Sequence, residues 1–297
     1  MQPYERGESP KITLYNFSEL KYNPIIKQLL REAKGRVIMK KVLCLVLAAL
    51  MIAACFVGCG AKENSDLAAV KKAGKIVVGI TEYAPMDFKD ANGNWTGFDA
   101  EFAQLFAKEL GVECEFFVIA DWSKKFYELE TRNIDAVWNG MTITEEALTN
   151  SSVSDPYVIN AQVVVMKADV VANYTDAASL KDLTVAVENG SAGQDAAAAA
   201  GVTNLVLVAD QAAALMEVAA GTSQACVIDI TMANAMTGEG TNYADLAAGI
   251  SLTSEEYGVS FRKESDLTEK FNAFMEKLIA DGTLQALAEK YSLTLAK

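Results

Sequence analysis

Segments with strand and helix patterns alternate twice along this chain, and that order constrains its fold more than any other feature. The first series predicts strands at residues 75–80, 113–119 and 134–138, separated by helices at 98–110 and 124–131. A strand–helix–strand order implies a parallel sheet whose right-handed crossover connections are the helices. This part of the chain is therefore expected to form an α/β unit.

The same order recurs in the following hundred residues. The second series predicts three strands and two helices, at residues 183–187, 193–200, 205–208, 211–220 and 225–230. Two terminal helices are expected at 266–280 and 284–291, and they must pack on one of the units. The sequence therefore predicts two similar α/β units in one protein.

The charge and the missing residue types narrow the function. Acidic residues number 39 and basic residues 26, so the formal net charge is −13. Such a surface repels nucleic acid and anionic lipid headgroups. The chain contains no histidine, which removes the usual general base and the commonest zinc ligand, and its five cysteines show no metal-binding spacing. We therefore expect a small-molecule or protein partner, with no metal and no cofactor.

Residues 39–58 resemble a bacterial lipoprotein signal, with two lysines, an apolar run and a small residue before Cys59. Cleavage there would leave the Cys59 thiol lipidated, with residues 59–74 as a tether on the extracytoplasmic face of the cell membrane. Cys55 ends a rival motif that fits almost as well. An uncleaved anchor is the other alternative, although the run is short for a spanning helix.

Residues 1–38 stand before a complete signal, whereas a secretory signal normally opens its chain. We predict that translation starts at Met39 and that residues 1–38 are a spurious upstream extension. Cys114 and Cys226 each lie in an apolar, strand-like run. Both are therefore expected to be buried and free.

Six stretches, in this order and spacing, resemble one family: "GITEYAPMDFKDANGNWTGFDAEFAQLFAKELG", "NIDAVWNGMTIT", "SDPY", "VAVENGSAGQDA", "ACVIDITMA" and "YGVSFRK". They are similar to extracytoplasmic solute-binding proteins of ABC importers, in the polar amino-acid group known as family 3. The resemblance covers roughly residues 75–295. It implies a monomer that captures a small polar amino acid or related solute and delivers it to a permease.

The resemblance also implies a two-lobed, type II periplasmic-binding-protein fold, in which each lobe is a mostly parallel sheet flanked by helices. The ligand would bind between the lobes. The first lobe would comprise residues 75–162 plus 255–297, and the second residues 163–254. Two hinge crossings are expected, at residues 162–167 and 257–261.

Binding roles follow from the resemblance residue by residue. Tyr83 and Trp122 match the aromatic positions that sandwich the ligand side chain, with ordinary core packing as the alternative. Asp229 matches the acid that accepts the α-ammonium group. Two loops match the positions that bind the α-carboxylate through backbone amides and hydroxyls: Asn139, Gly140 and Thr142 in one, and Gly190, Ser191 and Ala192 in the other. Amides at a helix start suit a carboxylate, and a carboxylate suits an ammonium.

The chain departs from the family at Ala147, where an arginine usually pairs with the ligand carboxylate. Lys124 and Lys125 follow Trp122 on a helix, where a solvated face is the expected reading and replacement of the missing cation the alternative. Glu82 and Glu188 are also expected to face water, with contact to a basic ligand side chain as the alternative for Glu188. Trp138 ends an apolar strand and is expected to serve packing. For Asp229, the alternative to ligand binding is a helix N-cap.

Two other functions compete with transport. One is an enzyme on the same scaffold, a dehydratase-like protein that uses the carboxylates of Asp229, Glu188 and Glu82. The sequence shows no recognisable nucleophile–base pair, which favours a binding protein that is not an enzyme. The other is a ligand-sensing module, for which no signalling domain follows in the chain.

Overall fold

The computed structural model describes residues 24, 25, 27, 28, 31, 34 and 65–297. The chain divides into two units, residues 1–63 and 64–297. In the first unit, the described residues are helical. The predicted extension 1–38, the signal 39–58 and both candidate lipidation sites, Cys55 and Cys59, lie wholly or mostly outside the described residues.

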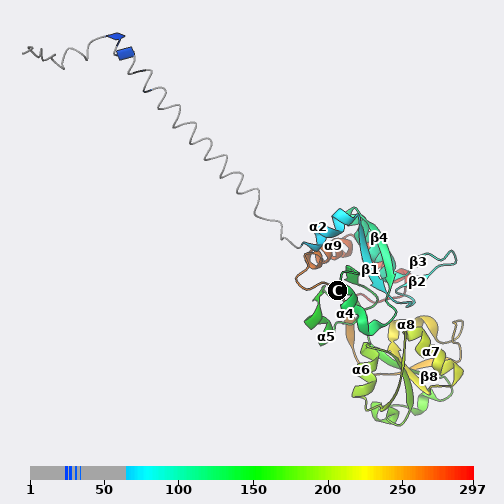
Figure 1. The fold of residues 1–297 in the computed structure, drawn as a ribbon. Helices are drawn as coiled ribbons and strands as arrows, with labels where there is room; N and C mark the ends of the chain where they lie inside the picture. The colour runs from blue at the N-terminus through cyan, green and yellow to red at the C-terminus, as the bar shows by residue number, and fades with distance from the viewer. Residues whose placement is uncertain (1–23, 26, 29–30, 32–33, 35–64) are drawn as a thin grey trace, which may run out of the picture. The chain divides into compact units, whose positions relative to one another are not determined.

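The second unit contains two five-stranded sheets, each the centre of a lobe (Figure 1). The first lobe is built on the strand order β4-β1-β5-β14-β6. Their bounds are β4 Glu113–Val118, β1 Lys75–Ile80, β5 Ala136–Val137, β14 Ser260–Phe261 and β6 Ser152–Val153. β4, β1 and β5 are parallel, as the alternation of strands and helices predicts, whereas β14 is antiparallel to both of its neighbours.

The second lobe repeats this plan with the order β10-β9-β11-β8-β12. Their bounds are β10 Asn204–Val208, β9 Thr184–Glu188, β11 Ala225–Asp229, β8 Gln162–Lys167 and β12 Leu246–Ser251. β10, β9 and β11 are parallel and β8 is antiparallel to both β11 and β12. The helices of this lobe are α6 Ala192–Ala199, α7 Gln211–Ala220 and α8 Ile230–Met236.

Helices cover the sheet of the first lobe as well. They are α2 Asp66–Ala73, α3 Phe98–Leu110, α4 Lys125–Glu130, α5 Glu145–Asn150, α9 Leu267–Ala280 and α10 Thr283–Lys290. Other short elements among residues 65–297 are the hairpin β2 Phe88–Lys89 and β3 Trp95–Thr96 and the 3-10 turns η2 Trp122–Lys124, η3 Val171–Asn173 and η4 Ala177–Leu180. No helix among the described residues has the length and apolar character that crossing a membrane requires.

A small antiparallel sheet joins the lobes. It pairs β7 Val158–Asn160 with β13 Glu255–Tyr257. The hinge crossings predicted from the sequence, residues 162–167 and 257–261, lie next to these joining strands and do not coincide with them. Residues 162–166 are buried as a strand of the second sheet, and β14 belongs to the first sheet. The joining strands instead contain polar residues, Asn160 and Glu255, that reach the site described below.

Aromatic side chains dominate the core of the first lobe. Trp138 is fully buried, and its ring meets Phe102 edge-on at 5.0 Å and Phe271 at 4.9 Å between centroids. Such edge-to-face pairs add stability beyond the burial of their area. The expectation that Trp138 serves packing is confirmed.

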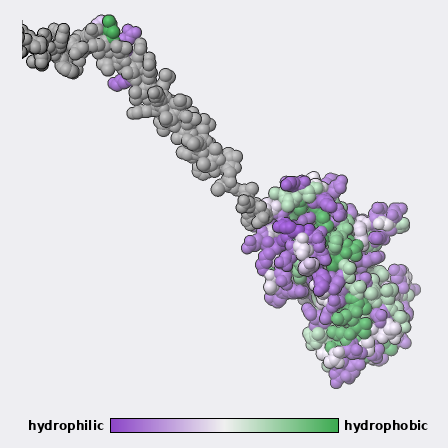
Figure 2. Space-filling view, viewed as in Figure 1, coloured by the Kyte–Doolittle hydropathy of each residue, from purple (hydrophilic) through white to green (hydrophobic). Residues whose placement is uncertain are grey.

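Hydrophobic colour gathers, on the face shown in Figure 2, over the second lobe where α6 and α7 lie in Figure 1. These helices are rich in alanine, a residue with high helix propensity. The first lobe presents a more hydrophilic surface on the same face. Cys226 is buried in the sheet of the second lobe and Cys114 is partly buried in that of the first, and both are free, as expected.

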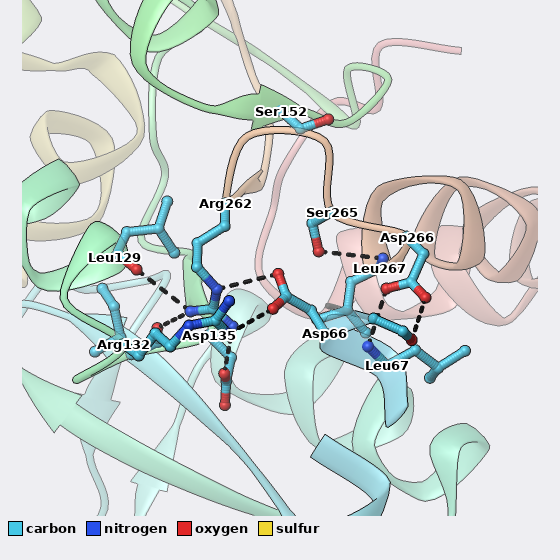
Figure 3. Close-up of polar contacts among 12 residues, drawn as sticks. Asp66, Leu67, Leu129, Arg132, Asp135, Ser152, Arg262, Ser265, Asp266 and Leu267 are labelled. Atoms are coloured by element: carbon cyan, nitrogen blue, oxygen red, sulfur yellow. Dashed lines mark hydrogen bonds and ion pairs between the residues drawn. The ribbon is translucent and has the colours of Figure 1, made fainter. Parts of the chain in front are cut away.

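The segment 66–73 is a docked helix, which differs from the expected tether over residues 59–74. Ser65 caps α2 by accepting a hydrogen bond from the Ala68 amide, and its hydroxyl donates to Asp266 at 2.5 Å. Asp66 is buried and pairs with both Arg262 and Arg132 (Figure 3). This ion-pair cluster fixes α2 to the first lobe, so any tether ends before Ser65.

Candidate functional site

A pocket lies between the two lobes, and eight of the nine predicted binding residues line it. The lining comprises Trp122, Lys125, Asn139, Gly140, Met141, Thr142, Thr144, Glu146, Gln162, Glu188, Gly190, Ser191, Ala192, Asp195, Gln211 and Asp229. Its free volume is about 30 Å³, which is room for a few water molecules at most. The lobes are therefore closed, and a solute of amino-acid size can enter only if they separate.

Contacts between the lobes hold this closed arrangement. Asn189 donates a hydrogen bond to Asp121 at 3.1 Å. Gly190 has a positive φ of 74°, and a side chain on it would come within 2.6 Å of the Ser123 Cα, so close approach of the lobes requires glycine there. The Ser191 hydroxyl caps α6 by accepting from the Gln194 amide.

Tyr83 is the predicted residue that does not line the pocket. Its ring lies against Gly140, and its hydroxyl bonds Thr231 of α8 and Tyr257 of β13, each at 2.5 Å. Thr231 and Tyr257 also bond each other at 2.9 Å. This cluster of three buried hydroxyls joins the lobes beside the hinge. Trp122, the other predicted aromatic residue, is buried and lines the pocket.

The loop at residues 139–142 uses its donors inside the protein. The Asn139 side chain accepts from the Thr81 amide at 2.9 Å and donates to the Thr81 hydroxyl at 2.7 Å. The Gly140 amide donates to Asp99 at 2.5 Å, and the Thr142 hydroxyl donates to Glu255 at 2.8 Å. The Gly140 amide and the Thr142 hydroxyl are therefore bonded to carboxyl groups of the chain itself.

Asp99 is fully buried beneath the turn and also accepts from the Tyr157 hydroxyl at 2.8 Å. Burial raises its pKa to about 7, although hydrogen bonds from Gly140 and Tyr157 act in the opposite direction. Neighbouring Asp87 is buried as well, and burial together with the charge of Asp99 raises its pKa well above the ordinary value. Burial of the two neighbouring acids thus disfavours two negative charges below the turn.

Asp229 ends β11, at the carboxyl edge of a parallel strand where ligand groups commonly lie. Its carboxylate accepts hydrogen bonds from Asn160, from Gln162 at 2.6 Å and from Gln211. Burial, then the neighbouring Glu255 carboxylate, raise the pKa of Asp229 to about 6, against the effect of these bonds. Although it occupies the N-cap position of α8, its side chain makes no capping bond, so the cap alternative is not borne out.

Glu188 is buried in the pocket, which corrects the expectation that it faces water. It is the last residue of β9, so it emerges beside Asp229 at the same edge of the sheet. Its Oε1 has no hydrogen-bond partner among the described residues. Burial, then the charges of Asp229 and Asp210, raise the pKa of Glu188 well above its ordinary value. Glu82, in contrast, is exposed as expected.

Lys125 is buried too, which corrects the expectation of a solvated face, whereas Lys124 is exposed. The Lys125 ammonium donates to the Gly190 carbonyl at 3.0 Å across the pocket and lies 3.5 Å from the Glu146 carboxylate. Burial lowers its pKa, whereas Glu146, Glu188 and Asp195 act to raise it. The first turn of a helix, read from sequence, does not reveal which of two adjacent lysines points inward.

Ala147 lies in an apolar cluster with Trp122, Met141 and Val137 and does not line the pocket. Gln162 and Gln211, which sequence patterns do not single out, hold the Asp229 carboxylate from two sides. No group of acid, cysteine and histidine side chains suited to a metal ion occurs among the described residues. The pocket lining, with several acids and one lysine, suits a small zwitterion or cation.

Comparisons with known proteins agree on one family. Residues 76–294 match the family model of bacterial extracellular solute-binding proteins, family 3. The chain is 30% identical to the L-cystine-binding protein TcyJ of Escherichia coli, over 82% of this chain and 94% of that one. It is also 30% identical to the arginine-binding extracellular protein ArtP of Bacillus subtilis, over 85% and 98%.

Solved structures give the same result. A mutant of ArgBP from T. maritima superimposes with a TM-score of 0.71 at 32% identity, over 76% of this chain and 98% of that one. The ancestral amino acid-binding protein AncCDT-1, described as a precursor of cyclohexadienyl dehydratase, superimposes with a TM-score of 0.69 at 32% identity, over 76% and 99%. The two-lobed fold is thus shared with these binding proteins.

Proposed function

The chain belongs to the bacterial extracellular solute-binding proteins of family 3, and from this we propose that it captures a small polar amino acid or related solute and delivers it to the permease of an ABC importer. The observation that carries the proposal is the buried carboxylate of Asp229 in a pocket closed by two lobes. A buried acid without a nearby cation suits a ligand ammonium group.

Capture proceeds by lobe closure. Asp229 accepts the ammonium from the second lobe, while Trp122 of the first lobe covers the ligand side chain. The closing surfaces meet at Asn189–Asp121 and at the tight approach of Gly190 to Ser123. A ligand that touches both lobes stabilises the closed state over the open one, because it loses its contacts with one lobe when they separate.

We expect no enzymatic turnover, although AncCDT-1 places a dehydratase precursor among the similar structures. Two buried acids with raised pKa values, Asp229 and Glu188, are what a dehydratase would use as proton donors. The sensing alternative shares the same binding site. Incubation of the protein with a bound amino acid, followed by mass spectrometry, tests the enzyme alternative: recovery of a dehydrated product would favour it.

The lobe boundaries and the monomeric state remain part of the proposal. We place the first lobe at residues 75–162 plus 255–297 and the second at 163–254, corrected by adding α2 to the first lobe and moving Gln162, the first residue of β8, to the second. The chain would act as a monomer. Residues 39–58 would direct export, and the lipid on Cys59 would hold the protein at the outer face of the cell membrane. The docked helix α2 shortens the connecting segment to the residues before Ser65.

Ligand binding should compact the molecule. An amino acid shown by calorimetry to bind should lower the radius of gyration in small-angle scattering, because the free protein in solution must populate an open state to admit the ligand and the bound ligand stabilises the closed one. At a hundredfold excess over the dissociation constant, binding should stabilise the fold by about 3 kcal/mol. An unchanged radius with a tightly bound ligand would contradict the hinge mechanism.

Anchoring is tested by two cysteine variants in cells. Cys59→Ser should release the protein into the medium, because no thiol remains for lipid at the expected cleavage site. Cys55→Ser is the matched control and should leave the protein attached to membranes. The reverse pattern in fractionated cells would move the lipidation site to Cys55.

A further inference from the structure

We infer that the Lys125 ammonium binds the carboxylate of the ligand, in place of the amides and hydroxyl of the turn at residues 139–142. The inference rests on the proposed function, since it assumes that the ligand is an α-amino acid. It assigns the anionic half of the ligand to a lysine of the first lobe and the cationic half to Asp229 of the second.

Three of the expected carboxylate donors already have partners inside the protein. The Gly140 amide donates to Asp99 at 2.5 Å, and the Thr142 hydroxyl donates to Glu255 at 2.8 Å. On the other lobe, the Gly190 amide donates to the Gln194 side chain at 2.8 Å. To use these three donors, a ligand carboxylate would have to displace built-in bonds, one of them to a fully buried acid.

The charges of the pocket lining also favour Lys125. The pocket lining carries four acids, Glu146, Glu188, Asp195 and Asp229. Lys125 is the only lysine or arginine in that lining within the described part of the chain. A ligand carboxylate placed among these acids without a cation would meet repulsion in a site where water does not screen it. Lys125 is therefore the group that can offset a negative charge here.

Lys125 is buried and lines the pocket. Its side chain is only 6% exposed, and its ammonium lies 5.4 Å from the Trp122 ring centroid and 4.9 Å from that of Phe126. Its ion pair with Glu146 is long, at 3.5 Å, and the Glu146 side chain is 57% exposed. An ammonium has three donors, and its one short contact is to the neutral Gly190 carbonyl. The charge is thus held in place but only weakly paired.

The neighbouring helix α5 offers no cation for the ligand carboxylate. α5 has six residues and begins with Glu145 and Glu146, so its first turn is acidic. Ala147 is buried in an apolar cluster and supplies no cation. Lys125 and Asp229 belong to opposite lobes, and Glu188 lies within electrostatic reach of both. An α-amino acid that bridges Lys125 and Asp229 would therefore link the lobes through its own two charges.

The test compares Lys125→Gln with Lys124→Gln, which removes the adjacent exposed charge. The probes are the twenty proteinogenic L-amino acids and L-cystine, followed by the α-amides of those that bind wild-type protein in calorimetry. Lys125→Gln should weaken the amino acids about 10- to 100-fold, as expected for a charge-assisted hydrogen bond. It should change the amides by less than about threefold, and Lys124→Gln should leave both kinds of ligand within about threefold of wild type.

Three outcomes would overturn the inference. Equal weakening of amino acids and amides would make Lys125 a latch between the lobes, acting through Gly190, and not a carboxylate ligand. Unchanged binding of amino acids would show that the turn at residues 139–142 rearranges to hold the carboxylate. If the variant fails to fold, wild-type protein still decides, since amides that bind as tightly as the acids would exclude a charge partner. Wild-type protein that binds none of the probes would refute the proposed function itself.

Discussion

Asp229→Asn should weaken binding of a ligand that carries an ammonium group by about 2–5 kcal/mol, which is at least about 30-fold. The substitution keeps the shape of the side chain, removes its charge and replaces one of the two acceptor oxygens by an amide donor. Asp229 is buried and receives hydrogen bonds from Asn160, Gln162 and Gln211, so no water replaces the lost charge. A desolvated ammonium left without its acid is the source of the cost. Calorimetry with an amino acid that wild-type protein binds measures the effect.

The control is Asp245→Asn, which removes an exposed acid of the same lobe that pairs with Lys167. It should leave affinity unchanged. The pH profile gives an independent readout, because the pKa of Asp229 is raised to about 6. Affinity should fall as the pH drops through 6, two units above the range of an ordinary aspartate. Retained affinity in Asp229→Asn, with a folded protein, would show that this acid only organises its amide neighbours.

Sequence patterns predict the parts of the site that depend on local order. Asp229 follows an apolar strand, so its place at the sheet edge follows from the strand pattern alone. Gly140, with its φ of 56°, and Gly190 stand in turns where glycine is the natural choice. The alternation of strands and helices likewise predicts the parallel core of both sheets.

The same patterns fail where a side chain depends on distant partners. Lys125 and Glu188 read as solvated charges, yet closure of the lobes buries both. The Gly140 amide reads as a free donor, yet Asp99, far away in the sequence, accepts its hydrogen bond. The sequence assigns residues 66–73 to a tether, because the ion pair of Asp66 with Arg262 forms only in the folded chain. In each case the deciding contact is tertiary.

Disruption of the buried ion-pair cluster around Arg262 should have the largest effect on the free energy of unfolding. Arg262 donates to Asp66 at 3.0 Å, to Asp135 at 2.8 Å and to the Ile134 carbonyl at 2.6 Å, and its side chain is 9% exposed (Figure 3). Arg262→Met keeps most of the apolar stem but leaves two carboxylates without their shared cation. We expect a loss of about 3–5 kcal/mol in the free energy of unfolding. Thermal denaturation should show a drop of roughly 6–20 °C.

Arg132→Met separates the charge effect from the burial effect. Arg132 pairs with the same Asp66 at 2.8 Å, but its side chain is 55% exposed, so water replaces much of the interaction. Its loss should cost about 1 kcal/mol or less. Equal destabilisation by both variants would mean that α2 is held by the number of ion pairs and not by their burial.

The pH dependence of stability tests whether charge causes the destabilisation of Arg262→Met. Burial alone would raise the pKa of Asp66, but hydrogen bonds from Arg132 and the charge of Arg262 outweigh it and lower the pKa. A carboxyl whose pKa is lowered by folding stabilises the protein above its unfolded pKa, and that stability is lost as the pH falls through the folded value. In Arg262→Met the buried Asp66 loses this support, so protonation relieves its burial. The gap in stability between wild type and Arg262→Met should therefore be widest near pH 7 and narrow below about pH 4. A constant gap across this range would show that lost packing of the arginine stem, and not charge, accounts for the destabilisation.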